Sequence, residues 1–255
     1  AKKALIVQGG GFRTAFSAGV LDVFMKHNYN PFDIYIGVSG GAIAASYYVA
    51  NQPLLCFEAM QHLCIKEPFI KFSRVLKSQP IMNVDVFYDI SNKHMPFDFD
   101  KALENLQNKQ MAIVMTDMKT GKPYYHHPTR ENWQDAVIAS CSLPFVSKGK
   151  HMLEGFEYMD GDWSDPLPVM WAIEQGATEI TLLMTLPNDI KKTQGWVDRI
   201  GAFYHRKSPL KQAFAKNHKN YNHAIEFIHS TEHSIKINRI SPDKKLKSQV
   251  YSDSL

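Results

Sequence analysis

The first fifty residues alternate short apolar runs with stretches of helical periodicity. Residues 4–8 predict a short buried strand and residues 14–27 predict a helix, with a glycine-rich turn between them. The same order follows at once, with a strand over residues 33–38 and a helix of small residues over 40–51. Two strand-turn-helix units in succession favour a mostly parallel sheet that is covered by helices.

The rest of the chain continues this pattern. Residues 111–116 and 179–185 are further strand candidates, and residues 53–108 predict helices punctuated by prolines. Near the carboxyl end we expect helices over residues 195–205 and 210–229, followed by a late strand. The prolines are Pro53, Pro68, Pro80 and Pro96. The alternating apolar residues of the late strand are Ile235, Ile237 and Ile240.

These elements predict an α/β fold with three layers, α/β/α, around a mostly parallel central sheet. A length of 255 residues suits one domain over residues 1–255, and the late strand indicates that residues 186–255 complete that domain. The content of 44% hydrophobic and 21% charged residues is typical of a globular chain and argues against disorder. The longest apolar stretches, such as residues 42–50, are shorter than the ~18–20 residues that span a bilayer.

The three cysteines, Cys56, Cys64 and Cys141, have neither the spacing of a metal site nor the even number of a disulfide framework. We expect them to be buried free thiols in a reducing compartment, and therefore expect a cytoplasmic protein.

The net charge of +4 is unevenly distributed along the chain. Residues 186–255 hold 13 Lys and Arg against 6 Asp and Glu, a net +7, whereas residues 1–185 have a net −3. The predicted helix over 195–205 combines apolar side chains at helical spacing with neighbouring cations, which suits peripheral contact with an anionic membrane. The alternative is a helix that packs its apolar stripe on the domain. We expect no nucleic acid partner, because the tail has no recognisable binding module. The side chains concerned are Trp196, Ile200, Phe203 and Tyr204, with Arg199, Arg206 and Lys207.

A G-x-S-x-G motif stands where the second predicted strand meets its helix. Its residues are Gly37, Val38, Ser39, Gly40 and Gly41. A nucleophile elbow needs small residues two before and two after the serine, because a tight turn brings those backbones together while the hydroxyl projects. A position at a helix amino terminus also favours developing negative charge. The alternative is a glycine-rich turn without chemistry.

The first turn, residues 9–13, has the sequence Gly-Gly-Gly-Phe-Arg. Successive glycines expose backbone N–H groups that could hold the oxyanion of an acyl-transfer intermediate. A dinucleotide-binding motif would need a third glycine where Thr14 stands, and a P-loop would need a Gly-Lys-Ser/Thr sequence that does not follow. Phosphate binding of another kind stays open.

A serine nucleophile needs a base, and Asp160 in the sequence Asp160-Gly161-Asp162 is the leading candidate. A glycine after the carboxylate indicates a tight turn at a strand end, where site residues often lie. An aspartate is a weak base at its reference pKa of ~3.9, so it would have to work in a partly desolvated pocket. Taken alone, an Asp-Gly pair is commonly a surface turn.

Together the three motifs resemble the patatin-like phospholipase family over about residues 4–170. In that family a G-G-G-x-R/K turn supplies the oxyanion hole, a G-x-S-x-G elbow the serine, and D-G-A/G the aspartate of a Ser-Asp dyad. Residues 139–144 also resemble the family's A-S-x-x-x-P segment. The matching positions are Gly9, Gly10, Gly11 and Arg13 in the first motif, Gly37, Ser39 and Gly41 in the second, and Asp160 and Gly161 in the third.

Thr14 and Asp162 depart from the family pattern, which often has glycine at the first position and alanine or glycine at the second. Neither departure replaces a reacting atom. Asp162 could raise the pKa of Asp160 as a like charge, or it could face solvent, which is our expectation.

A Ser-His-Asp triad is the rival mechanism, because a histidine follows the acid in the α/β-hydrolases. Most histidines after Asp160 fall in the predicted tail helices among Lys and Arg, where we expect them to be solvated. The pair His126-His127 and His151 precede Asp160, and the pair lacks a third metal ligand. The histidines that follow are His205, His218, His223, His229 and His233.

The resemblance implies a serine acyl hydrolase that cleaves lipid acyl esters and needs no metal or organic cofactor. Ser39 would attack the ester, and N–H groups of Gly9, Gly10, Gly11 and Gly40 would bind the oxyanion. Asp160 would then activate water against the acyl-Ser39 intermediate. The alternative from another class is a catalytically silent lipid-binding or regulatory protein on the same fold.

Overall fold

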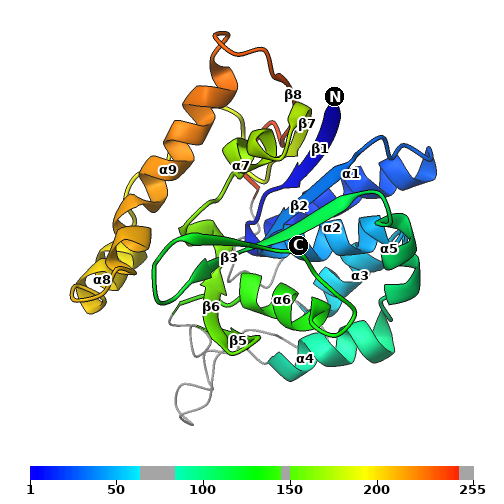
Figure 1. Ribbon diagram of the computed structural model, residues 1–255, viewed down its shortest axis with the longest axis horizontal. Helices are drawn as coiled ribbons and strands as arrows, with labels where there is room; N and C mark the ends of the chain where they lie inside the picture. The colour runs from blue at the N-terminus through cyan, green and yellow to red at the C-terminus, as the bar shows by residue number, and fades with distance from the viewer. Residues whose placement is uncertain (64–83, 145–149, 247–255) are drawn as a thin grey trace.

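The computed structural model describes residues 1–63, 84–144 and 150–246. Its centre is a sheet of eight strands in the order β5-β6-β3-β2-β1-β7-β8, with β4 also paired to β3 (Figure 1). The strands are β1 (Lys2–Val7), β2 (Ile34–Val38), β3 (Gln110–Asp117), β4 (Pro123–His126), β5 (His151–Leu153), β6 (Phe156–Asp160), β7 (Ala177–Leu183) and β8 (Lys236–Ile240).

The prediction of a mostly parallel sheet is confirmed. The pairs β1-β2, β2-β3, β1-β7 and β7-β8 are all parallel. One side of the sheet differs from the prediction, because β4 and β6 run antiparallel to β3, and β5 runs antiparallel to β6. This antiparallel part carries Asp160 at the end of β6.

Helices cover both faces of the sheet, which confirms the three-layer α/β/α architecture (Figure 1). Successive side chains of β1 point to opposite faces of the sheet and belong to two different hydrophobic clusters. Leu5 and Val7 pack with residues of α1 to α6, whereas Ala4 and Ile6 pack with residues of α7 and α9. The helices are α1 (Thr14–Lys26), α2 (Gly40–Val49), α3 (Leu55–Gln61), α4 (Val84–Asp89), α5 (Phe99–Asn105), α6 (Trp133–Ser140), α7 (Val169–Glu174), α8 (Trp196–Tyr204) and α9 (Lys211–His229).

Helix α2 is buried along its whole length, from Gly40 to Val49. Its small residues allow this position, because glycine, alanine and serine let neighbouring backbones approach. A helix enclosed on every side cannot shift easily, so the turn that precedes it is held in one place.

The segment over residues 53–108 contains the helices α3, α4 and α5, and a short π-helix, Ile90–His94, continues α4. Residues 64–83, with Pro68, Pro80 and Cys64, lie outside the described part of the chain. The predicted tail elements correspond to α8, α9 and β8, and β8 pairs with β7 in the central sheet. The division of the chain into domains stays a prediction. None of the helices in the described residues combines the length and the apolar character that crossing a bilayer requires.

Candidate active site

Ser39 lies between the end of β2 and the start of α2, as the motif predicts. Its backbone has φ 54° and ψ −127°, a conformation that side-chain-bearing residues rarely adopt. The turn is tight enough to require glycine on both sides. A Cβ atom at Gly37 would lie 2.5 Å from Cα of Ala42, and one at Gly41 would lie 2.1 Å from the carbonyl oxygen of Val7. This geometry is that of a strand-to-helix nucleophile elbow.

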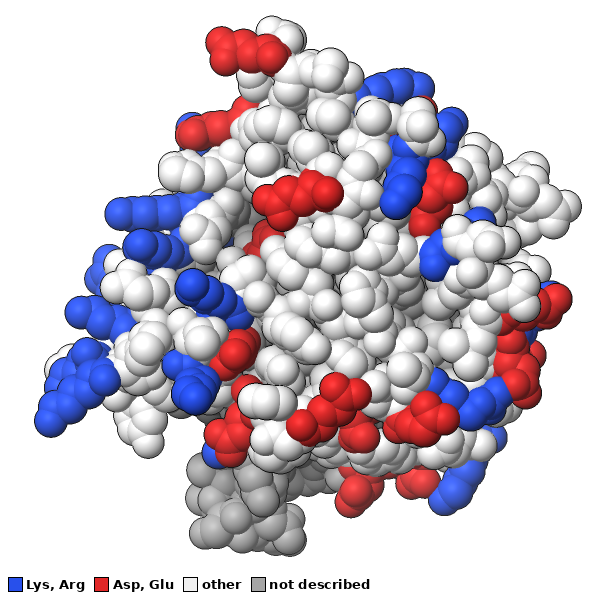
Figure 2. All heavy atoms as spheres, in the orientation of Figure 1, with Lys and Arg blue, Asp and Glu red and all other residues white. Residues whose placement is uncertain are grey.

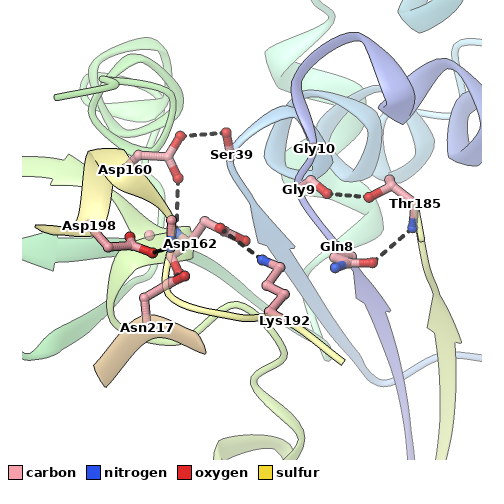
Figure 3. Close-up of polar contacts among 12 residues, drawn as sticks. Gln8, Gly9, Gly10, Ser39, Asp160, Asp162, Thr185, Lys192, Asp198 and Asn217 are labelled. Atoms are coloured by element: carbon pink, nitrogen blue, oxygen red, sulfur yellow. Dashed lines mark hydrogen bonds and ion pairs between the residues drawn. The ribbon is translucent and has the colours of Figure 1, made fainter. Parts of the chain in front are cut away.

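The pairing of β3 brings Ser39 and Asp160 together. Val38 of β2 pairs with Val114, and the next residue of β3, Met115, pairs with Asp160 of β6. The Ser39 hydroxyl donates a hydrogen bond of 2.6 Å to Oδ2 of Asp160 (Figure 3). Two residues that are 121 positions apart in the chain therefore contact each other directly.

Asp160 is almost fully buried, with 1% of its surface exposed. Its second oxygen, Oδ1, accepts the N–H of Asp162 at 2.9 Å. Burial and, next, the nearby Asp162 carboxylate raise the pKa of Asp160 to about 7, against the opposing effects of its hydrogen bonds and of Lys192. A carboxylate with this pKa is a much stronger base than an ordinary aspartate.

The segment after α6 ties both residues in place. Oγ of Ser140 accepts the backbone N–H of Ser39 at 2.8 Å and donates to the carbonyl of Val114. The carbonyl of Ser142 accepts the N–H of Asp160 at 2.9 Å. These residues belong to the segment over 139–144, which only the family resemblance singled out. Spacing alone offered no signal for their contacts.

The glycine turn is fixed by side chains from two other places. Oγ1 of Thr185, just after β7, donates to the carbonyl of Gly9 at 2.6 Å (Figure 3). Nε of Arg13 donates to the carbonyl of Gly10 at 3.2 Å. Gly10 has φ 150° and Gly11 has φ 58°, which glycine adopts readily. Thr185 was missed by sequence reasoning, because it reads as the last residue of a buried strand.

The four predicted oxyanion donors occupy different positions. Gly11 and Gly40 line a pocket together with Ser39. Gly40 is the first residue of α2, so its N–H has no acceptor within the helix. Gly9 packs against Ser39, since a Cβ atom there would lie 2.9 Å from Cβ of Ser39, and a Cβ atom at Gly10 would meet Thr185. The structure thus brings Gly11 and Gly40 to the pocket, and the role of all four stays a prediction.

The pocket at Ser39 is mostly apolar and adjoins a second apolar cavity. Ile43, Leu63 and Phe87 line both spaces. Cys141 also lines the pocket, and burial holds the pKa of its thiol well above the usual value, so the thiol stays neutral. The further residues of the second cavity are Ser46, Tyr47, Ala59, Ile90, Ser91, Phe97, Trp133, Gln134, Val137 and Ile138.

Asp162 does not simply face solvent, and our expectation on this point is wrong. Its side chain is 31% exposed and lies 3.4 Å from Nζ of Lys192. Nδ2 of Asn217 in α9 donates to its carbonyl (Figure 3). Burial lowers the pKa of Arg13, and the Asp162 charge opposes this shift. A folded tail packs against this position, which local sequence could not reveal.

Gly161 allows the chain to pass close to β3 after Asp160. A Cβ atom there would lie 2.2 Å from the carbonyl oxygen of Val114. The Asp-Gly pair is therefore a buried turn in this chain and not the surface turn that is its common setting.

All eleven histidines lie in the described residues, and none stands between Ser39 and Asp160, which bond directly. His223 and His229 are exposed, as predicted for solvated side chains. The prediction is wrong for His205, His218 and His233, which are half-buried. The ring of His205 stacks on Phe214 with the ring centroids 5.6 Å apart. Over the described ranges, no group of three or more His, Cys, Asp or Glu side chains could hold a metal ion.

The sequence profile of the patatin-like phospholipase family matches residues 5–173. The protein YjjU of Escherichia coli (strain K12), described as uncharacterized, is 31% identical over 248 residues, which cover 96% of this chain and 70% of that protein. VipD from Legionella pneumophila is 12% identical with a TM-score of 0.45, over 97% of this chain and 63% of its own. A chain of the Pseudomonas aeruginosa complex of SpcU with ExoU is 12% identical with a TM-score of 0.32, over 88% of this chain and 53% of its own. The chain thus spans less than two thirds of either solved chain. Because the family profile covers well over half of its residues, this chain belongs to the patatin-like phospholipase family.

Proposed function

We propose that the protein is a serine acyl hydrolase that cleaves lipid acyl esters with a Ser39-Asp160 dyad. The observation that carries the proposal is the hydrogen bond of 2.6 Å from the Ser39 hydroxyl to the buried Asp160, at a strained strand-to-helix turn. Family membership supports lipid acyl hydrolysis in general. The dyad and its donors are our assignment.

The first half of the reaction forms an acyl-serine. Asp160 takes the hydroxyl proton while Oγ of Ser39 attacks the ester carbonyl carbon. The carbonyl oxygen becomes an oxyanion, which accepts hydrogen bonds from backbone N–H groups of the glycine turn and of Gly40. When the tetrahedral intermediate collapses, the C–O bond to the alcohol breaks and Asp160 returns the proton to that alcohol.

The second half regenerates the enzyme. Asp160 removes a proton from water, the water oxygen attacks the acyl carbon, and the bond to Oγ of Ser39 breaks. Ser39 takes the proton back, and a carboxylic acid leaves. An alcohol in place of water would give acyl transfer through the same steps. The raised pKa of Asp160, about 7, supports its role in taking up and returning a proton near neutral pH.

The pocket supports an acyl chain as the group bound beside Ser39. Its lining is mostly apolar, and the adjoining cavity extends it toward Phe97 and Trp133. Apolar surface of this kind favours a hydrocarbon chain over a polar acyl group.

We also propose a cytoplasmic location with access to a membrane surface. Cys56 and Cys141 are buried free thiols, which suits a reducing compartment. A lipid substrate requires access to lipid, by contact with a membrane or with monomers in solution.

Labelling with a fluorophosphonate, followed by mass spectrometry, tests the nucleophile. We expect one adduct, on Ser39, and loss of roughly 10³-fold or more of ester hydrolysis in both Ser39→Ala and Asp160→Asn. Asp165→Asn is the matched control, because it replaces another carboxylate whose pKa is raised by burial, to about 6, and which accepts a hydrogen bond from Tyr125. That variant should keep the label and most of the activity.

The same experiment addresses the catalytically silent alternative. Labelling of Ser39 without turnover of any short or lipid ester would favour a lipid-binding protein, and a wild-type level of hydrolysis in Ser39→Ala would refute the proposed nucleophile.

A further inference from the structure

Helix α8 presents its largest apolar side chains to solvent. Trp196 is 73% exposed, Phe203 is 70% exposed, Tyr204 is 72% exposed and Ile200 is 48% exposed. Their spacing of i, i+4, i+7 and i+8 places them on one side of the helix, which we call the α8 apolar face. Four such side chains on nine residues far exceed the single exposed apolar residues that are normal on a surface.

The opposite side of α8 is what holds the helix in the fold. Gly201 is buried against α9, where a Cβ atom would lie 2.2 Å from the ring of Phe214. Ala202 packs on the small cluster around Phe214. Oδ2 of the buried Asp198 accepts the N–H of Gly195 at 2.8 Å and fixes the helix start. The helix therefore packs through its small residues and keeps its large ones outside, the reverse of what stability alone would favour. The alternative drawn from the sequence, that this helix packs its apolar stripe on the domain, is therefore wrong.

Positive charge surrounds the α8 apolar face. Residues 191–219 contain eight Lys and Arg and a single acidic residue, Asp198, which is buried. Arg199, Arg206 and Lys207 are exposed, and the Arg206 guanidinium lies 4.9 Å from the centroid of the Phe203 ring. Figure 2 shows Lys and Arg side chains gathered over α8 and α9, on the left of the molecule. The charge of this surface is complementary to an anionic partner.

We propose that the α8 apolar face inserts into the surface of an anionic lipid bilayer. Tryptophan and tyrosine prefer the boundary between head groups and acyl chains, phenylalanine and isoleucine bury below it, and flanking cations bind anionic head groups. The aromatic face and the surrounding cations together favour this partner over a nucleic acid, which would use cations with stacked or base-reading side chains.

This contact would bring the part of the molecule that holds Ser39 and Asp160 toward the membrane. Lys192, in the segment that leads into α8, lies 3.4 Å from Asp162, and Asp162 is two residues from Asp160 (Figure 3). This step rests on the proposed function, whereas binding to vesicles does not depend on Ser39 chemistry. The inference thus names the surface from which the proposed hydrolase would reach its substrate.

Binding is measured with Ser39→Ala, so that the lipids stay intact. The full chain is sedimented with vesicles of phosphatidylcholine, alone or mixed in equal parts with phosphatidylglycerol. We expect binding to the mixed vesicles that weakens as salt rises, because the exposed cations are screened. Trp196 is the most exposed tryptophan among the described residues, so its fluorescence should shift to the blue and be quenched by brominated acyl chains. Trp196→Phe should remove most of that signal.

Two paired variants separate insertion from charge. Phe203→Ser with Tyr204→Ser should weaken partitioning roughly tenfold or more, and Arg206→Gln with Lys207→Gln should weaken it about fivefold per charge at low salt. The matched controls are Phe156→Ser, an exposed phenylalanine of β6, and Lys2→Gln with Lys26→Gln, which lie toward the amino ends of the parallel strands. The controls should bind like the parent chain.

Three outcomes would overturn the inference: equal binding by the α8 variants, equal binding to neutral vesicles, or an oligomer in solution that the α8 variants lose while vesicles bind nothing. Hydrolysis of a short soluble ester, measured in chains with Ser39 intact, should be unchanged by the α8 substitutions. A chain that binds vesicles but hydrolyses no ester would refute only the proposed function. A chain that hydrolyses the ester but ignores vesicles would refute only the membrane contact.

Discussion

At the scale of single residues, the charges around Asp160 should decide how the proposed dyad responds to pH. Asp160 contacts Ser39 and the N–H of Asp162, and the Asp162 carboxylate is paired with Lys192. Cys141, another titratable neighbour, stays neutral because burial raises the pKa of its thiol. The proposed base is therefore flanked by the Asp162 carboxylate and by the Lys192 cation that partly offsets it.

We predict that kcat/KM on a soluble ester rises with pH through an apparent pKa near that of Asp160, about 7, because only the ionised form is a base. Asp162→Asn removes a like charge and should move this limb to lower pH. Lys192→Met removes the compensating cation and should move it to higher pH. Shifts of both variants in the same direction would contradict this account.

The ionisation of Asp160 should affect folding stability in the opposite direction from activity, so that stability falls as pH rises. A carboxyl whose pKa is higher in the folded than in the unfolded chain stabilises the fold while it is protonated, and this contribution is lost as pH rises from about 4 to about 7. We therefore expect Asp160→Asn to melt a few degrees above wild type at pH 8, with little difference at pH 4. Thermal unfolding followed by circular dichroism at the two pH values measures this, and a lower Tm at pH 8 would be the contrary result.

At the scale of elements, the turn at Ser39 depends on a close approach between α2 and β1. Gly41→Ala would place a Cβ atom 2.1 Å from the carbonyl of Val7, so we predict a loss of roughly 3 kcal/mol or more in unfolding free energy. Gly19→Ala, in the exposed part of α1, meets no atom within 4 Å and should stabilise the chain by up to about 1 kcal/mol. Urea denaturation compares the two variants. If the two variants changed the unfolding free energy by similar amounts, the requirement for glycine at position 41 would not come from close packing against Val7.

The elements that could be predicted from sequence are those with long, strong patterns. The first two strand-turn-helix units were placed within two residues at their ends, because apolar runs and glycine turns mark them clearly. The antiparallel part was missed, because β4 and β5 have only four and three residues and β6 begins with two exposed ones. Strands this short have no readable alternation, and their pairing with β3 is a tertiary contact.

The same distinction holds for the site. Ser39 and Asp160 could be found because each belongs to a motif with a geometric reason. Thr185 and Lys192 could not, because each acts through a hydrogen bond or a charge pair across 30 or more positions of chain. Ser140 was singled out only by the family resemblance, and its bond to Val114 could not be predicted. The sequence also left the direction of the α8 apolar face open, since helical spacing shows that a face exists and not which way it points.

At the scale of the whole molecule, β7 lies between β1 and β8, and its end carries the residue that fixes the glycine turn. The family match ends at residue 173, before β7 begins. We predict that a fragment of residues 1–173 will not fold, because one edge of β1 and the face that α9 covers would be exposed. Expression of this fragment beside the full chain, with gel filtration of each, tests the prediction. A monomeric, fluorophosphonate-reactive fragment would show that the shorter piece suffices.

The order of strands also bears on how such a chain can be recombined. Strand β1 pairs on one edge with β2, which follows it closely in the chain, and on the other edge with β7, which comes much later. The pairing of β1 is therefore complete only when both segments are present. Exchanging gene segments at residue 173, where the family match ends, would separate β1 from β7. Crossovers that keep residues 1–13 together with residues 177–185 are the ones expected to yield working chimaeras.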